Sequence, residues 1–209
     1  MLEVAMKTVG PMQENTYVVI HPNQEVILFD PGAEADKLIE WIDGQGWKPK
    51  AILQTHCHFD HIGGLDQLRD YYHVPVYVHT LEADFLGDPA LNLSTMLTQP
   101  IIQRKADHLW ESMGEVSIAS FKFEVKHTPG HSPGHVIYLF DEDKFVISGD
   151  LVFAGSVGRT DLPNASHQQL MESIQREILP LSDNYQLYPG HGNPTFVAQE
   201  RQNNPYFPK

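Results

Sequence analysis

Three histidines and one aspartate are packed into six consecutive positions near residue 60. Imidazole nitrogens and carboxylate oxygens are ligands that suit zinc, iron and manganese in proteins. In an extended segment successive side chains alternate, which turns three of these donors to one side and Cys57 to the other. The last donor falls at an expected helix start, where the chain can turn it back to the same cluster. The four candidate ligands are His56, His58, Asp60 and His61.

Three further donors each follow a strand-like segment and a glycine. Glycine permits tight turns and close approach of the backbone, which helps where several loops crowd around one ion. These donors are His131 in Thr-Pro-Gly-His, Asp150 in Ser-Gly-Asp and His191 in Tyr-Pro-Gly-His. Seven ligands exceed the four of a single zinc ion and suit two ions with shared or open positions. We therefore predict two divalent metal ions, with zinc as the first candidate and iron and manganese as alternatives.

The donor-bearing loops follow the ends of expected strands, and strands alternate with helices along the chain. Strand-like patterns cover 16–20, 25–29, 51–54, 74–78, 116–127, 136–140, 144–148 and 185–188. Helical patterns cover 34–43, 61–72, 166–178 and a tail from about 195, with Ser166 as an N-cap. Hairpins near both ends of this order favour an α+β fold, a four-layer αββα sandwich, over a purely parallel α/β fold. Residues 80–115 carry too weak a pattern for an assignment.

Composition limits the class of protein. The chain has 209 residues, 41% of them hydrophobic, which suits one globular domain over 1–209. Its net charge of -13 repels phosphate backbones, so no nucleic-acid partner is expected. A single cysteine, Cys57, excludes an intrachain disulfide and is expected to be a small buried thiol. We read no signal peptide and no apolar run of membrane-spanning length, so we expect a cytoplasmic protein without a membrane partner.

The ordered set of donors resembles that of the metallo-β-lactamase fold superfamily. Thr-His-Cys-His-Phe-Asp-His at 55–61 matches its His-x-His-x-Asp-His signature, and the later donors match its later ligand positions. The resemblance covers nearly the whole chain and implies an αββα sandwich with the metals at one edge. It also implies that the first metal is held by His56, His58 and His131, and the second by Asp60, His61 and His191, with Asp150 bridging them.

Within that superfamily the chain is most similar to the hydroxyacylglutathione hydrolase (glyoxalase II) group. The similarity lies in Thr-Pro-Gly-His-Ser-Pro-Gly-His at 128–135 and in the stretch 149–163, which resembles the short bacterial members. It implies hydrolysis of a small-molecule thioester by metal-activated water, with Asp60 and Asp150 as catalytic residues. Metallo-β-lactamases usually carry Cys or Ser where Asp150 stands, whereas thioester, phosphodiester and lactone hydrolases carry the bridging Asp.

The chain departs from the long glyoxalase II enzymes in the parts that bind glutathione. Those enzymes have a C-terminal helical domain, for which this chain leaves no room, and a Lys and a Tyr two residues apart after the bridging Asp. Arg159 and Asp161 stand at the corresponding positions, so a cation is kept and an aromatic hydroxyl is lost. We predict that Arg159 binds a carboxylate of the substrate. We expect His135, four residues beyond a candidate ligand, to support the site without binding metal.

Two other functions fit part of this pattern. A persulfide dioxygenase shares the fold and much of the ligand set but uses a single iron, which His56, His131 and Asp150 would hold. The third interpretation is a non-enzymatic binding protein that keeps a hydrolase fold without the activity. The complete ligand set argues against it. The sequence sets neither the acyl group, nor the thiol, nor the oligomeric state.

Overall fold

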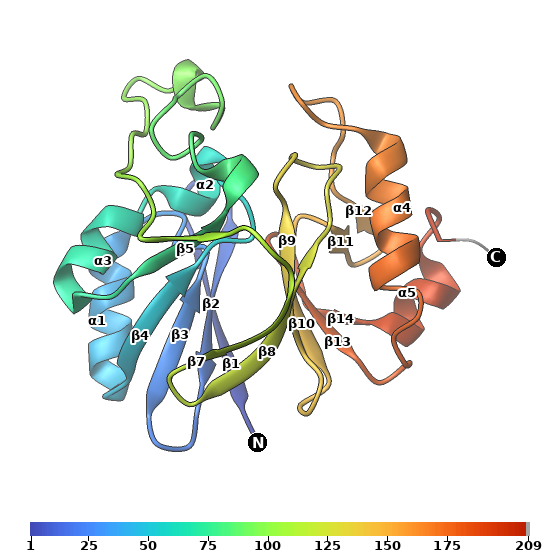
Figure 1. Cartoon of the computed structure of the whole chain (residues 1–209), viewed down its shortest axis with the longest axis horizontal. Helices are drawn as coiled ribbons and strands as arrows, with labels where there is room; N and C mark the ends of the chain where they lie inside the picture. Colours follow the sequence, from blue (N-terminus) through green and yellow to red (C-terminus); the bar gives the residue numbers. More distant parts are fainter. Residues whose placement is uncertain (208–209) are drawn as a thin grey trace.

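The computed structural model describes residues 1–207, and within them twelve strands form two six-stranded sheets that face each other (Figure 1). The first sheet has the order β1 (Glu3–Val9), β2 (Glu14–Ile20), β3 (Glu25–Phe29), β4 (Lys48–Leu53), β5 (Val76–His79) and β6 (His108–Trp110). The second has the order β14 (Thr195–Phe196), β13 (Gln186–Pro189), β10 (Phe145–Gly149), β9 (Val136–Phe140), β8 (Phe121–His127) and β7 (Gly114–Ile118). Two short strands, β11 (Val152–Phe153) and β12 (Ser156–Val157), pair separately.

Helices cover the outer face of each sheet (Figure 1). The first sheet is covered by α1 (Ala35–Gln45) and α3 (Leu65–Tyr72), and the second by α4 (His167–Glu177) and α5 (Val197–Asn203). The short helix α2 (Phe59–Ile62) lies between β4 and α3 in the chain. Ser166 accepts a hydrogen bond from the Gln169 backbone N–H and so caps α4, as the sequence predicts.

Alternation along the strands builds three buried layers. In β2, Tyr17 and Val19 pack between the two sheets, whereas Val18 packs under α1 and α3. In β9, Tyr138 faces the first sheet and Ile137 packs under α4. Because side chains on a strand point to opposite faces in turn, a strand buried on both faces must be apolar throughout. These layers confirm the predicted αββα sandwich.

The structure differs from the sequence prediction in several elements. Strand β1 was not expected, because it lies at a sheet edge and only Val9 of its side chains is buried. Strand β6 lies in the segment 80–115, where no element was assigned. The expected strand 116–127 is a hairpin that turns at Ala119, whose φ of 50° is left-handed. The expected helix 61–72 is two helices, α2 and α3, separated at Gly63 and Gly64.

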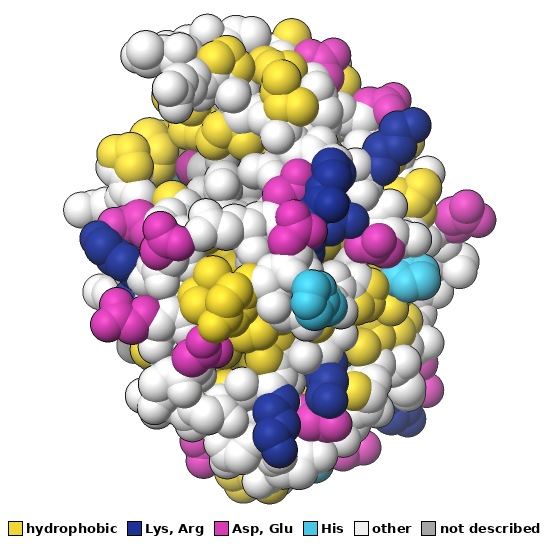
Figure 2. Space-filling model, turned by 90° about the vertical axis from the view of Figure 1, so that its left-hand side faces the viewer, with side chains coloured by type: hydrophobic (Ala, Val, Ile, Leu, Met, Phe, Trp, Pro, Cys, Tyr) yellow, Lys and Arg dark blue, Asp and Glu magenta, His cyan; other side chains and the backbone are white. Residues whose placement is uncertain are grey.

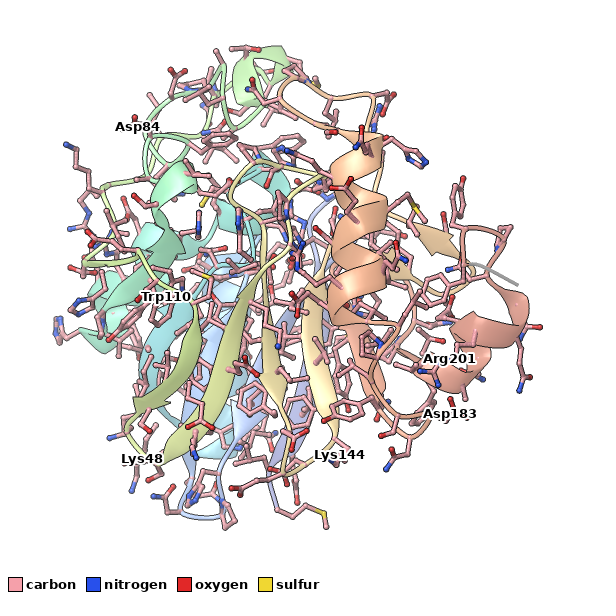
Figure 3. All side chains as sticks on the ribbon, turned by 45° about the vertical axis from the view of Figure 1, so that its right-hand side comes forward. Lys48, Asp84, Trp110, Lys144, Asp183 and Arg201 are labelled. Atoms are coloured by element: carbon pink, nitrogen blue, oxygen red, sulfur yellow. The ribbon has the colours of Figure 1, made fainter. Side chains whose placement is uncertain are left out.

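Strand direction carries the donor-bearing loops to one end of the molecule. Lys48 begins β4 and Lys144 directly precedes β10, and both lie at the end opposite Asp84 (Figure 3). Strands β10 and β13 are parallel, with Gly149 paired to Pro189, so both strands end at the same edge of the sheet. Loops that follow β4, β10 and β13 therefore meet at the end marked by Asp84.

The surface is mixed in charge. On the face that Figure 2 shows, acidic and basic side chains are interspersed around smaller apolar patches. At the opposite side of the molecule, Arg201 of α5 pairs with Asp183, and the two lie close together in Figure 3. No helix within residues 1–207 is long and apolar enough to cross a membrane.

Candidate metal centre

The loop after β4 is fixed by a buried carboxylate. Asp30 accepts hydrogen bonds from the Thr55 backbone N–H at 2.7 Å and from Thr55 Oγ1 at 2.5 Å. His56 and His58 follow on extended chain, with Cys57 between them buried in the core as the sequence predicts. Helix α2 then begins at Phe59, two residues before the helix start expected from the sequence. Asp60 is therefore aimed by the first helical turn and not by strand alternation, which corrects the sequence prediction.

The first cluster unites both sheets. Ligand atoms of His56, His58 and His131 all lie within 4.8 Å of one another, and His58 Nδ1 is 3.0 Å from His131 Nε2. The His131 Nδ1–H donates to the Arg159 backbone oxygen at 2.9 Å, and this carbonyl accepts only. His56 Nδ1 lies 3.1 Å from the Thr55 hydroxyl. These contacts leave the Nε2 atoms of His56 and His131 free to coordinate.

The second cluster consists of Asp60, His61 and His191, whose ligand atoms also lie within 4.8 Å of one another. Asp60 Oδ2 is 3.2 Å from His191 Nε2. The Nδ1 atom of His61 faces Asp30 Oδ2 at 3.1 Å, which directs Nε2 toward the cluster. Asp30 also lies with His56 and His61 in a group whose ligand atoms are within 4.8 Å of one another, but Thr55 and His61 occupy its oxygens, so we assign it a supporting role.

Asp150 lies between the two clusters. Its Oδ2 is 3.4 Å from His131 Nε2 and 3.7 Å from His191 Nε2, and its Oδ1 is 3.5 Å from His61 Nε2. One carboxylate therefore faces a nitrogen of the first cluster and two nitrogens of the second. This is the position that a bridging ligand requires.

Unpartnered polar atoms test whether metal ions fit this centre. His56 Nε2, His61 Nε2 and Asp150 Oδ1 are buried and have no hydrogen-bond partner within residues 1–207. Burying a polar atom without a partner is costly, and native proteins rarely leave three together. Divalent cations would satisfy all three atoms, and the nitrogen and oxygen donors suit zinc, iron or manganese. The residues therefore fit a dinuclear metal centre.

His56, His58 and Asp150 are already in the charge states that bind metal. Burial, together with the nearby His61, lowers the pKa of His56 well below its ordinary value. Burial and the neighbouring His131 lower the pKa of His58 to about 3, so both side chains are neutral imidazoles. Burial opposes the charge of Asp150, but His61 and His131 outweigh it and lower the pKa of the carboxyl. Neutral imidazole and ionised carboxylate are the forms that bind metal.

A network of hydrogen bonds next to the centre holds the turn that carries His191. The Asn15 backbone N–H donates to the Gly190 oxygen at 2.8 Å, and Asn15 Nδ2 donates to the Gly192 oxygen at 2.7 Å. Tyr17 donates its hydroxyl to the Pro189 oxygen at 2.7 Å. Gly190 is required here, since a Cβ would lie 2.2 Å from Asp150 Oδ1.

His135 supports the loop of Asp150, as the sequence predicts. Its Nε2 accepts the Asp150 backbone N–H at 3.0 Å, and its Nδ1 is 2.9 Å from Thr128 Oγ1. An acceptor at Nε2 must be unprotonated, and burial lowers the pKa of this imidazole. His135 therefore fixes the loop of Asp150 without binding metal.

A buried carboxylate that the sequence analysis missed joins two of the ligand loops. Glu82 Oε2 accepts the Cys57 backbone N–H at 3.0 Å, next to His56 and His58. Its Oε1 accepts from Ser132 Oγ at 2.6 Å and from the Gly134 N–H at 2.9 Å, in the loop of His131. Burial raises the pKa of Glu82 to about 7. An isolated glutamate in a weakly patterned segment gave no signal of this role.

Replacing Glu82 with alanine is expected to weaken the first cluster. Three buried donors would lose their acceptor, so we expect a loss of about 3 kcal/mol in the free energy of unfolding. We also expect metal affinity to fall about tenfold to a hundredfold, as for other groups that orient ligands. Metal titration and thermal unfolding measure both effects. Glu82→Gln, which keeps one acceptor oxygen, should lie between, and the exposed Glu115→Ala should change nothing. Unchanged metal affinity in a folded Glu82→Ala protein would refute the role.

Arg159 reaches the centre with its backbone. Gly158 packs so closely that a Cβ there would lie 1.9 Å from the Asp150 backbone oxygen. The next backbone carbonyl, that of Arg159, accepts the hydrogen bond from His131. The guanidinium makes a bidentate pair with Asp161, at 2.7 Å from Nε and 2.8 Å from Nη2. Both side chains are exposed, so substrate binding by Arg159 stays a prediction.

The chain was compared with known proteins. The family model described as the metallo-beta-lactamase superfamily matches residues 9–191. The probable metallo-hydrolase YqgX of Bacillus subtilis is 44% identical over 95% of this chain and 94% of its own length. The hydroxyacylglutathione hydrolase GloC of Haemophilus influenzae is 31% identical, with 98% of each chain covered.

Solved structures agree with this match. The BLEG-1 B3 metallo-beta-lactamase has a TM-score of 0.96 and 44% identity, covering 99% of this chain and 100% of that one. The protein TTHA1623, solved in a di-iron-bound form, has a TM-score of 0.86 and 38% identity, covering 97% and 100%. The fold, the ligand arrangement and these relatives together establish that the chain belongs to the metallo-β-lactamase superfamily, as a metallo-hydrolase.

Proposed function

We propose that the chain hydrolyses small thioesters at a dinuclear centre, with 2-hydroxyacyl glutathione thioesters as the first candidates. The observation that carries the proposal is Asp150, whose two oxygens face both clusters. Two relatives support it. GloC is a hydroxyacylglutathione hydrolase by name, and TTHA1623 holds two irons. Zinc, iron and manganese all suit the donors.

Two divalent ions, when bound, lower the pKa of water toward neutrality and polarise a carbonyl. The chain contributes the positions. Asp60 sits in the first turn of α2, where burial opposes its charge but His61 and His191 outweigh it and keep its pKa low. The ionised Asp60 carboxylate can accept a hydrogen bond from water and so orient a lone pair of the water oxygen. The thiolate of the substrate is a stable leaving group, so no strong acid is needed at the departing sulfur.

A substrate comparison tests this proposal. Metal-loaded protein is incubated with lactoylglutathione and, separately, with glutathione persulfide, while free thiol and dissolved oxygen are recorded. We expect thiol release from the thioester without oxygen uptake, and no sulfite from the persulfide. Sulfite formation with oxygen uptake would instead identify a mononuclear iron persulfide dioxygenase.

A second candidate is β-lactam hydrolysis, which the 44% identity and TM-score of 0.96 to BLEG-1 favour. Both reactions attack an acyl carbon and need the same activated water. A chromogenic β-lactam in the same assay separates them. If its kcat/KM exceeds that of every thioester tested, the β-lactam is the better substrate and thioester hydrolysis is secondary.

The exposed pair of Arg159 and Asp161 predicts a charge-dependent KM. Arg159→Ala should raise KM for an anionic thioester about tenfold, since a guanidinium–carboxylate contact at the surface is screened by solvent. Turnover and metal content should not change, and a neutral thioester should be affected much less. Asp161→Asn is the matched control, because it frees the guanidinium and should lower KM. Equal losses on anionic and neutral thioesters would show that Arg159 supports the loop only.

A further inference from the structure

A small apolar cavity opens directly beside the metal centre. Its volume is about 110 Å³, and Asp60 is both part of its lining and part of the second cluster. The apolar lining comes from four separate segments, namely the β1–β2 turn, the residues after β3, the start of α2 and the segment before β6. The side chains used below are those of Val9, Met12, Ala33, Phe59, Leu97 and Ile101.

The cavity offers a ligand apolar contact and little else. Apart from Asp60, the lining residues carry hydrocarbon or thioether side chains or, in the glycines, none. Met12 lies 51% exposed at the rim, and a flexible thioether in that position can adapt to a bound group. Such a surface favours an apolar group, because burial there removes hydrocarbon from water on both sides. A charged or hydroxylated group would lose hydration without gaining a hydrogen bond.

The loop that contacts His131 has the other polarity. His131 of the first cluster is bonded to the Arg159 backbone, and the Arg159–Asp161 pair lies exposed in that loop. The centre thus has an apolar cavity at Asp60 and an exposed charged pair in the loop that contacts His131. We call the part of the surface around this pair the charged rim. A polar, anionic thiol such as glutathione fits the charged rim. The acyl side chain of the same thioester then points to the cavity.

The volume limits the group that fits. An apolar protein cavity of about 150 Å³ takes up benzene. A cavity of about 110 Å³ is smaller, so it suits a branched alkyl group of roughly three or four carbons better than a phenyl ring.

We propose that this cavity is the acyl side-chain site and that it selects 2-hydroxyacyl groups with a short branched alkyl side chain. The inference rests on the proposed thioesterase function. The carbonyl and the 2-hydroxyl stay at the metal centre, and only carbons beyond the α position enter the cavity. The expected order of kcat/KM therefore rises from no side chain, through methyl and isopropyl, to isobutyl, and falls for phenyl. Each added carbon that is buried should raise kcat/KM about fourfold.

Glutathione thioesters of glycolic, lactic, 2-hydroxy-3-methylbutanoic, 2-hydroxy-4-methylpentanoic and mandelic acid test this order. Ala33→Leu fills the cavity, so it should abolish the advantage of the branched groups and affect kcat/KM for the glycolyl thioester least. Leu97→Ala enlarges the cavity and should raise kcat/KM for the mandelyl thioester relative to the other thioesters. Met96→Ala is the matched control, since Met96 is 78% exposed in the same segment and does not line the cavity. Thermal unfolding verifies that each variant is folded.

Binding of the free 2-hydroxy acids, measured by calorimetry on metal-loaded protein, gives a readout that does not depend on turnover. The acids should follow the same order of affinity, and Ala33→Leu should remove it. If the acids follow the order but no thioester is hydrolysed, the cavity assignment stands and the proposed function fails. If thioesters are hydrolysed with no dependence on side chain, in the unmodified chain and in both cavity variants, the proposed function stands and the cavity assignment is overturned.

Discussion

Asp150→Asn is expected to bind one metal ion where the unmodified chain binds two, and to lose most of its turnover. The amide has no charge to offset the repulsion between two cations, and its nitrogen would face His61 or His131 with a donor. Because even groups that only orient ligands cost tenfold to a hundredfold, we expect kcat to fall more than about a hundredfold. Metal analysis and steady-state kinetics on the same preparation measure both effects.

The control for this variant is Asp161→Asn, the same chemical change at an exposed position eleven residues later in the chain. It should keep both metals and its kcat. An Asp150→Asn protein that is folded, holds two metals and turns over at a near-normal rate would show that the bridging role is wrongly assigned.

Metal uptake is expected to release protons from the second cluster. Burial opposes the charged form of His61, but Asp150 and Asp60 outweigh it and raise its pKa well above 6.5. In His191, burial also opposes the charge, and the bond to Asp60 raises the pKa. A metal ion must displace these protons, so affinity should rise with pH, by about tenfold per unit for each proton released. Calorimetry in two buffers of different ionisation enthalpy counts the protons.

Folding stability should change with pH in opposite directions in metal-free and metal-loaded protein. Without metal, protonated His61 contributes stability that is fully present below its unfolded pKa of about 6.5 and is lost as pH rises through the higher folded pKa. With metal, stability should increase with pH over the same range, because binding strengthens. His73→Asn, at an exposed position at the C-terminal end of α3, should leave the proton count unchanged. Metal binding without proton release at about pH 6 would contradict the charge assignment.

The sequence could predict the donors because they follow strand ends. His131, Asp150 and His191 each follow a strand-like segment and a glycine, and strand direction brings such positions to one end of a sandwich. The residues that hold the donor loops in place could not be predicted from the sequence, for a different reason. Asp30 and Glu82 act on backbone N–H groups of distant loops, and a backbone partner leaves no trace in residue type.

The segment 80–115 escaped assignment for a related reason. Much of its order comes from side-chain bonds to its own backbone and not from periodic burial. Asn92 Nδ2, for example, donates to the Phe85 oxygen at 2.9 Å and to the Ile101 oxygen at 3.0 Å. Hydrophobic periodicity therefore carries little signal there, although this segment supplies Glu82 and part of the apolar cavity.

The division of the ligands between the two sheets has a kinetic consequence. Residues up to Trp110 build the first sheet and those from Gly114 build the second, and each cluster takes donors from both. Two metal ions would therefore act as crosslinks between halves that fold from contiguous stretches of chain. Crosslinks of this kind form only after the halves have docked, so they should slow unfolding and leave the refolding rate nearly unchanged. Resistance to proteolysis or heat over hours would then be set by how slowly metal dissociates.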